Sequence, residues 1–206
     1  MATRNGLVKK TDLMEYDNIR KGGLAAVTLR ENDELIDVKL TDGNQDIMLS
    51  TVNGMAIRFK ETDARPIGRV SQGVKGIELE EGDYVIGMDV VTDNTTLLVV
   101  TENGFGKRTE LDEYKVQTRG GKGVLTYRIT EKTGKAIGMM LVSEEDDIIL
   151  ISSDGSIIRM KVSEISILGR ATQGVTLMRM SEGNYVVSMA RMVKEEGSDE
   201  NDCEDQ

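Results

Sequence analysis

The chain has 206 residues, 30% of them charged, and a formal net charge of −10. It contains no histidine and only one cysteine, which excludes ordinary zinc sites and histidine-assisted Ser or Cys catalysis. Cys203 has no partner for an intramolecular disulfide, which suits a reducing cytoplasm. No apolar run approaches the ~18 residues of a membrane span, and no signal peptide opens the chain.

Turn signals recur along the chain with a regular spacing. Four Asn-Gly or Asp-Gly pairs have glycines 48, 50 and 51 residues apart: Asn5-Gly6, Asn53-Gly54, Asn103-Gly104 and Asp154-Gly155. Strand-like runs precede the last three pairs and follow the pairs, a pattern typical of type I′ hairpins. A second turn follows each glycine by about 28 residues and leads into another strand-like run, at 35–40, 85–90, 136–141 and 186–191.

Equivalent positions of the four repeats carry similar residues. Four residues after each turn glycine stand Lys10, Arg58, Arg108 and Arg159, and fifteen residues after it stand Lys21, Arg69, Arg119 and Arg170. The column ten residues after the glycine (Tyr16, Ala64, Tyr114, Ile165) is expected to consist of side chains packed in the core. The column at nineteen (Ala25, Gly73, Gly123, Gly174) holds only small residues.

Repeats of about fifty residues with four short strands each predict an all-β, propeller-like array. We expect about four four-stranded blades within one domain, residues 1–194, with repeats near 1–48, 49–98, 99–149 and 150–194. The first repeat lacks preceding strands, so either another repeat supplies one or the chain starts mid-array. Residues 195–206 hold seven acidic residues and no basic one, which predicts a disordered tail.

Charge alternates with the repeat. Windows 4–23, 54–76, 104–123 and 155–175 hold 18 basic and 9 acidic residues, whereas the rest of the chain holds 8 basic and 27 acidic. Equivalent positions of an array lie along one edge, so the two basic columns predict a continuous positive rim. Such a rim suits double-stranded DNA held by its phosphates without reading of sequence. The rival hypothesis is a propeller that binds proteins through its acidic faces and tail.

These residues resemble one family. The stretches 2–11, 51–59, 100–109, 114–124 and 168–175, in this order, are similar to the C-terminal DNA-wrapping domain of the bacterial DNA gyrase A subunit. The resemblance covers about residues 1–193. It implies a β-pinwheel, a propeller relative whose neighbouring blades exchange strands. It also implies a non-catalytic module that wraps DNA and supports ATP-dependent negative supercoiling by the holoenzyme.

The partners and cofactors also follow from the resemblance. It implies three partners: double-stranded DNA, the rest of the gyrase A subunit, and the gyrase B subunit. It places the use of ATP and magnesium elsewhere in the holoenzyme, with no cofactor in this chain. It further implies a monomeric isolated domain in the bacterial cytoplasm, associated with the nucleoid.

The chain departs from the family pattern in one motif. The family heptapeptide Q-R-R-G-G-K-G belongs to the first blade, whereas its best match here, Gln117–Gly123, has Thr118 at the first Arg and lies in the third repeat. The family has about six blades against four here, so we expect this chain to begin after the blade with the true box. The equivalent domain of the topoisomerase IV A subunit, with fewer blades and a degenerate box, is the alternative.

Other interpretations of single motifs are weak. The motif Gln117, Thr118, Arg119, Gly120, Gly121, Lys122, Gly123 lacks P-loop spacing, so it is interpreted as a turn whose cations meet phosphates. A tyrosine nucleophile is disfavoured because the Tyr16 column tolerates Ala and Ile. Asp42–Asp46 imitates a calcium loop but lacks its glycine and bidentate Glu, and no metal site is expected.

The predicted DNA contacts are Lys10, Lys21, Arg58, Arg69, Lys107, Arg108, Lys115, Arg119, Lys122, Arg159 and Arg170. No catalytic residue is predicted.

Overall fold

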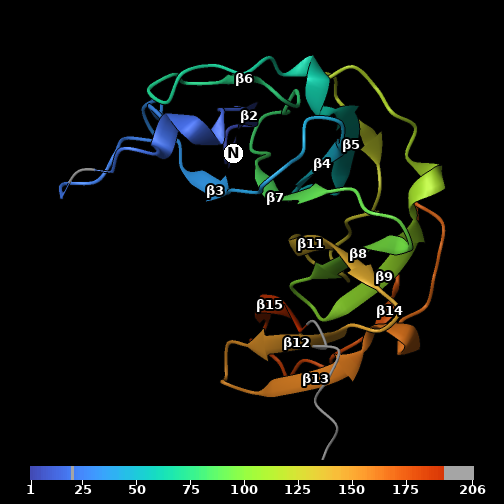
Figure 1. Cartoon of the computed structure of the whole chain (residues 1–206). Helices are drawn as coiled ribbons and strands as arrows, with labels where there is room; N and C mark the ends of the chain where they lie inside the picture. The colour runs from blue at the N-terminus through green and yellow to red at the C-terminus, as the bar shows by residue number, and fades with distance from the viewer. Residues whose placement is uncertain (20, 193–206) are drawn as a thin grey trace, which may run out of the picture.

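The computed structural model describes residues 1–19 and 21–192, which form four small antiparallel sheets in a row along an arc (Figure 1). The predicted acidic tail at 195–206 lies outside the described residues. Within them, the regular elements are short strands and four 3₁₀ turns, one in each repeat. The all-β, propeller-like architecture expected from the repeat is therefore confirmed.

The first three sheets have four strands each. The first contains β1 (Ala2–Thr3), β2 (Leu7–Val8), β3 (Leu35–Asp37) and β6 (Val74–Lys75). The second contains β4 (Asp46–Thr51), β5 (Met55–Lys60), β7 (Val85–Val90) and β10 (Val124–Leu125). The third contains β8 (Thr95–Thr101), β9 (Phe105–Glu110), β11 (Ala136–Ser143) and β14 (Val175–Thr176).

The fourth sheet differs from the prediction of four-stranded blades. Over the described range it has three strands, β12 (Asp147–Ser152), β13 (Ile157–Lys161) and β15 (Val186–Met192). The reason is that the fourth strand of each other sheet comes from the following repeat: β6 pairs with β2, β10 with β5 and β14 with β9. Strand exchange, which the family resemblance implied, thus links the first three sheets to their successors.

A 3₁₀ turn follows the second strand of every repeat: η1 (Leu13–Tyr16), η2 (Glu61–Asp63), η3 (Leu111–Glu113) and η4 (Val162–Glu164). From η2, η3 and η4 the chain crosses to the preceding sheet. We call these connections, residues 66–73, 116–123 and 167–174, the crossover loops. In Figure 1 they follow the outer side of the arc, while β3, β7, β11 and β15 face its hollow.

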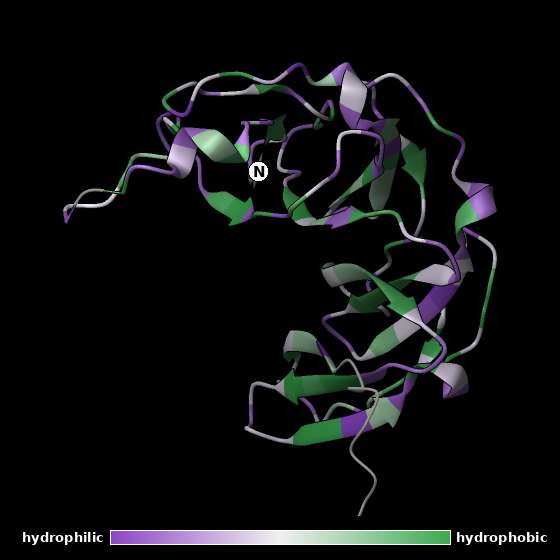
Figure 2. Cartoon of the chain, in the orientation of Figure 1, coloured by the Kyte–Doolittle hydropathy of each residue, from purple (hydrophilic) through white to green (hydrophobic). Residues whose placement is uncertain are grey.

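The hydrophobic core lies between sheets rather than within one. Strand β8 shows this best, because Leu97 and Val99 pack toward the second sheet and Leu98 and Val100 toward the fourth. A strand buried on both faces needs a continuous apolar run, which 97–100 supplies. Figure 2 accordingly shows hydrophobic strands inside the array and hydrophilic turns around it.

The four hairpins have a different turn from the predicted type I′. The turn glycines have positive φ, from 76° to 84°, but Asn5, Asn53, Asn103 and Asp154 do not. Each glycine N–H instead donates to the carbonyl three residues earlier, as from Gly54 to Thr51 at 3.0 Å. This is a three-residue loop, a type I turn completed by a left-handed glycine.

The packing column is confirmed in the last three repeats, whereas Tyr16 of the first repeat is only half-buried and Ala25 of the small-residue column is exposed. Ala64, Tyr114 and Ile165 are buried at the ends of their 3₁₀ turns. In the small-residue column, a Cβ on Gly123 would lie 2.3 Å from the Ala56 carbonyl oxygen of the preceding sheet. Gly73 and Gly174 meet the same obstacle, so the column is small because the exchanged strand enters there at close range.

Candidate nucleic-acid interface

The basic column four residues after the turn glycine joins neighbouring repeats. The Arg58 guanidinium donates to the Leu111 carbonyl oxygen of η3 at 3.1 Å, and the Arg108 Nε donates to the Ile165 carbonyl oxygen beside η4 at 2.9 Å. Lys10 lies 3.4 Å from the Glu61 carboxylate of η2. Each of these cations therefore ties its own hairpin to the 3₁₀ turn of the next repeat.

This role contradicts the expectation that the column forms part of an exposed rim. Arg108 is only 3% exposed, and its ion pair with Glu144 occupies another guanidinium nitrogen. Arg58 also pairs with Asp46 at 2.8 Å, so both arginines are engaged inside the fold. Arg159, in the last repeat, is 57% exposed and pairs with Asp147. Its exposure reflects the absence of a following 3₁₀ turn from the described residues.

The structure places Lys107, another predicted DNA contact, in the interior with no exposed surface. A phosphate could reach this ammonium only if the loop above it moved away. The sequence could not show that Lys107 and Arg108 are both buried, because a cation in a basic window looks the same whether its side chain is exposed or buried.

Three members of the column fifteen residues after the turn glycine, Arg69, Arg119 and Arg170, lie in the crossover loops, at the outer side of the arc. Each loop is anchored in the same way, because an N–H of the loop donates to the carbonyl of the basic residue in the preceding hairpin. The pairs are Ile67 with Lys10 at 2.9 Å, Gln117 with Arg58 at 2.8 Å and Leu168 with Arg108 at 2.8 Å. The loops therefore present Arg69, Arg119 and Arg170 at equivalent places of successive sheets.

The middle loop is the predicted motif 117–123. The Arg119 Nε donates to the Asp63 carbonyl at 2.9 Å, and a terminal nitrogen donates to the Lys75 carbonyl at 2.8 Å. Lys122 is 62% exposed and lies 3.5 Å from the exposed Glu80 carboxylate. Gly120 takes a φ of +82°, so the sharp turn expected at this glycine is present.

Further exposed cations accompany the loops. Lys115 and Lys21, both predicted, are exposed just before the middle loop and in the first repeat. Arg65 and Lys75, beside the first loop, are exposed as well and were not among the predicted contacts. The signal that could have found Arg65 is its alignment with Lys115, since both stand eleven residues after a turn glycine.

The segment 42–46 that imitates a calcium loop has a different internal partner. The buried Glu61 carboxylate accepts hydrogen bonds from the N–H groups of Gly43 and Gln45, both at 2.9 Å, and from the Thr41 hydroxyl. Burial favours a neutral acid, but these hydrogen bonds and Lys10 outweigh it and hold the pKa of Glu61 below its usual value. A loop whose N–H groups point inward at a carboxylate is built around an anion, which supports the turn interpretation.

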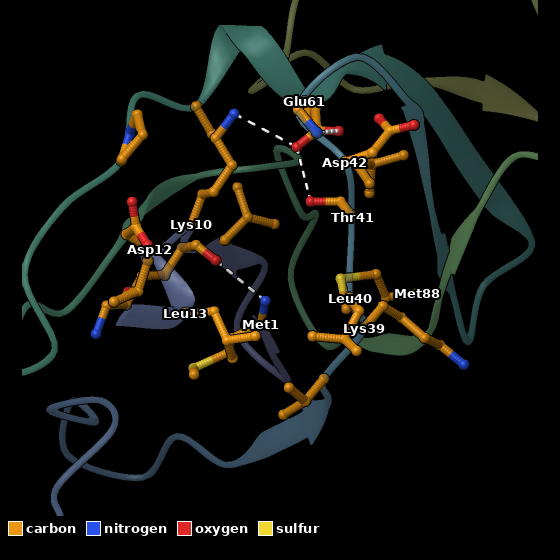
Figure 3. Close-up of a pocket in the computed structure, with 18 of the residues that line it drawn as sticks. Met1, Lys10, Asp12, Leu13, Lys39, Leu40, Thr41, Asp42, Glu61 and Met88 are labelled. Atoms are coloured by element: carbon orange, nitrogen blue, oxygen red, sulfur yellow. Dashed lines mark hydrogen bonds and ion pairs between the residues drawn. The ribbon is translucent and has the colours of Figure 1, made fainter. Parts of the chain in front are cut away.

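A cavity of about 460 Å³ opens beside η1, and Figure 3 shows its lining. Exposed apolar side chains such as Leu13 and Leu40 surround it, and several of its polar groups bind one another. Lys10 pairs with Glu61, which also binds Thr41, and the Met1 amine donates to the Lys9 carbonyl (Figure 3). The Tyr16 hydroxyl, which also lines the cavity, is buried without a hydrogen-bond partner, but no second acid or base is paired with it as a catalytic constellation requires.

The array corresponds to a known family of domains. The family model of the DNA gyrase C-terminal domain, described as a β-propeller, matches four successive segments, residues 1–42, 45–92, 95–143 and 146–191. The chain belongs to the DNA gyrase C-terminal domain family. Each matched segment contains one of the four turn glycines and the hairpin around it.

Curated relatives agree with this assignment. The DNA gyrase A subunit of Staphylococcus epidermidis is 45% identical over 95% of the chain, and that of Staphylococcus aureus NCTC 8325 is 44% identical over all of it. The chain spans little more than a fifth of these relatives, 22% and 23% of their lengths.

Two solved domains share the fold over most of the chain. The C-terminal domain of a DNA topoisomerase IV has a TM-score of 0.87 at 32% identity, covering 92% of this chain and 60% of that one. A DNA gyrase A C-terminal domain has a TM-score of 0.83 at 26% identity, covering 93% of this chain and 64% of that one.

Two kinds of feature are missing from the part of the chain that the structure describes. No helix among residues 1–19 and 21–192 is long and apolar enough to span a membrane. The same residues contain no group of three or more acidic or Cys side chains arranged to hold a metal ion.

Proposed function

We propose that this chain is a non-catalytic DNA-binding module that bends and wraps double-stranded DNA along the outer side of the arc. The observation that carries the proposal is the series of crossover loops, which repeat one geometry from sheet to sheet and each carry an arginine at the same place. Phosphates recur regularly along a duplex, so a regular series of cations suits the DNA backbone rather than a particular base sequence.

The proposed contacts are those cations that the fold leaves accessible in or beside the loops: Lys21, Arg65, Arg69, Lys75, Lys115, Lys122 and Arg170. Arg119 instead donates to two backbone carbonyls and holds the middle loop. Lys10, Arg58, Lys107 and Arg108 are assigned to the structure instead. A duplex that follows the arc must bend, which costs on the order of 1–6 kcal/mol per 20–30 bp. Contacts from several loops together must offset this cost, so the loops act as a group.

In the full protein, we propose that the module serves DNA gyrase in the bacterial cytoplasm, where it works with the remainder of the A polypeptide and with the B subunit. The 45% identity to gyrase A sequences supports this assignment over topoisomerase IV. Strand passage and ATP hydrolysis, with their magnesium, would then belong to other domains, and this chain would use no cofactor and act as a monomeric unit.

The proposal is tested by the salt dependence of binding to two duplexes of unrelated sequence, measured by fluorescence anisotropy. With ~6–10 phosphate contacts, affinity falls by ~10³–10⁵ between 50 and 200 mM salt, equally for both duplexes. Replacing Arg69, Lys122 and Arg170 by Ala should reduce the slope of log K against log salt by about 2.7, or about 0.9 for each contact.

A matched variant replaces three exposed cations outside the loops, Lys132, Lys135 and Arg179, and should change the slope far less. Equal losses in the two variants would mean that net charge, not the loops, governs binding. Weak binding that is insensitive to salt would instead favour the protein-interaction platform.

A further inference from the structure

Two lysines are buried beneath crossover loops. Lys9 and Lys107 stand three residues after the turn glycines of the first and third repeats and are 5% and 0% exposed. The Lys107 Nζ donates to the carbonyl oxygens of Gly169, at 2.5 Å, and of Arg170. The Lys9 Nζ donates to the carbonyl oxygens of Ala26, at 2.5 Å, and of Arg69. Each ammonium therefore hydrogen-bonds the backbone carbonyl of the loop arginine itself.

Packing does not explain a charge at this position. The equivalent residues of the second and fourth repeats are Ile57, fully buried, and Ile158. An aliphatic side chain thus fills the same place in the same architecture, while a buried ammonium is costly to desolvate. Burial lowers the pKa of Lys107 to about 8, the nearby Glu113 opposes this, and the Arg170 charge adds to it. Such a residue points to a task other than stabilising the core.

The loop above Lys107 is held at several points, all by backbone groups. Besides the two carbonyls gripped by Lys107, the Gln173 carbonyl accepts from the buried Tyr127 hydroxyl, and the Arg170 N–H donates to Glu113 at 3.1 Å. The Arg170 side chain is 34% exposed and meets Glu113 at 3.6 Å. Its backbone is fixed, while its guanidinium keeps an accessible side.

The middle loop is held in place in a different way. It lies over Ile57, so no ammonium is available from below, and here the loop arginine turns inward and binds carbonyls of the preceding repeat. Lys122 is then the outward cation of this loop. Where a lysine holds the loop from beneath, the arginine is bound less closely than Arg119: Arg69 donates to the Ala25 carbonyl oxygen at 3.4 Å, and Arg170 lies 3.6 Å from the Glu113 carboxylate.

We propose that Lys9 and Lys107 are positioning residues for DNA, which hold the first and third crossover loops so that Arg69 and Arg170 meet phosphates. The lysines do not touch DNA themselves. This inference rests on the proposed function and deepens it, because it distinguishes cations that contact DNA from cations that hold the contacting residues in position.

The test is a double-mutant cycle in the full chain, with Lys107→Met, Arg170→Ala and the double variant. Affinity for a fluorescent 40-bp duplex (a length of about four helical turns) is measured over a salt series. Each single change should weaken binding about tenfold and lower the salt slope by about 0.9. The double variant should be no weaker than Arg170→Ala alone, because a positioning residue has no effect once the group it positions is gone.

Two results would overturn the inference. If Lys107→Met weakens binding as much in the Arg170→Ala background as in the wild type, the lysine acts independently of the arginine. If Lys107→Met leaves the affinity and the salt slope unchanged, the hydrogen bonds from Lys107 to the loop are not needed for DNA binding. Lys135→Met, at an exposed site before the inner strand β11, controls for the loss of one charge and should have little effect on either quantity.

Folding is checked by thermal unfolding of each variant, and hydrogen exchange follows the amides of 168–174, which should exchange faster in Lys107→Met. Should that variant fail to fold, a double-mutant cycle of Lys9→Ile with Arg69→Ala tests the same inference. Isoleucine is chosen because it stands at the equivalent position of the second repeat, Ile57. A wild-type chain without salt-dependent binding would refute the proposed function, whereas normal wild-type binding with an additive cycle would refute this inference alone.

Discussion

Replacing the turn glycine of the third repeat by alanine should separate two reasons for a glycine at this place. Gly104 and Gly155 occupy equivalent turns and have φ of +76° and +84°, so alanine suffers a similar conformational penalty at both, about 1 kcal/mol. They differ in surroundings. A Cβ on Gly104 would lie 2.0 Å from the Met178 carbonyl oxygen of the next repeat, whereas nothing lies within 4 Å of one on Gly155.

The clash also threatens hydrogen bonds between repeats. The Gly104 carbonyl accepts from the N–H groups of Leu177 at 2.8 Å and Met178 at 3.0 Å, just beyond the exchanged strand β14. If the two segments separate, each lost bond costs about 1 kcal/mol. We therefore expect Gly104→Ala to lower the free energy of unfolding by about 3 kcal/mol and Gly155→Ala by about 1 kcal/mol.

Urea unfolding followed by circular dichroism measures the two free energies, and hydrogen exchange locates the damage. In Gly104→Ala the amides of Leu177 and Met178 should lose protection, while those of the first sheet keep it, because each repeat contacts only its neighbours. Equal destabilisation by the two substitutions, with no local loss of protection, would refute the reasoning that close approach of the exchanged strand requires this glycine.

Three further outcomes follow from the buried charges. Arg108→Met should lower the free energy of unfolding, measured in urea, by about 1–3 kcal/mol, because it leaves a buried carbonyl oxygen without a hydrogen bond. Arg159→Met should lower it by less than about 1 kcal/mol, because this arginine is exposed. Burial lowers the pKa of Lys107 to about 8 in the folded chain, so the unfolded chain binds more protons between pH 8 and the ordinary value of 10.5, and stability should rise with pH over this range. In a pH series of unfolding curves Lys107→Met should reduce this rise, to which Lys9, whose pKa is also lowered, contributes. Glu61 has a lowered pKa, so its contribution should be lost as pH falls through that value, and Glu61→Gln should flatten the acid limb of the same series.

The repeat explains why so much of the fold could be predicted from the sequence. A turn glycine about every fifty residues aligned the repeats, and the aligned columns identified Tyr114 as a packing position and Gly123 as a position for a small residue. Four copies of one pattern constrain each other, because a residue type forced by geometry must recur. The turn type was predicted wrongly because Asn-Gly fits both the two-residue type I′ loop and the three-residue loop. The signal that distinguishes them is the Thr or Ser two residues before each Asn or Asp. In the second repeat, the hydroxyl of this residue, Thr51, accepts a hydrogen bond from the Met55 N–H.

The role of the first basic column could not be predicted for a physical reason. A guanidinium serves equally well for a phosphate and for a backbone carbonyl, and both uses require the same residue in every repeat. Strand exchange decides between them, because it brings the 3₁₀ turn of the next repeat over Arg58 and Arg108. The carboxylates at Asp46 and Asp147, eight residues before the turn glycine in two repeats, were the available signal that this column works inside the fold.

The central claim is that the accessible cations of the crossover loops guide DNA along the outer side of the arc. The measurement that tests it most directly is topological: the chain is bound to nicked circular DNA at low salt, the nick is sealed with ligase, the protein is removed and the linking number is determined. The account predicts a shift that grows with protein concentration and is lost when Arg69, Lys122 and Arg170 become Ala, but not when Lys132, Lys135 and Arg179 do. Tight binding with no change in linking number would contradict it.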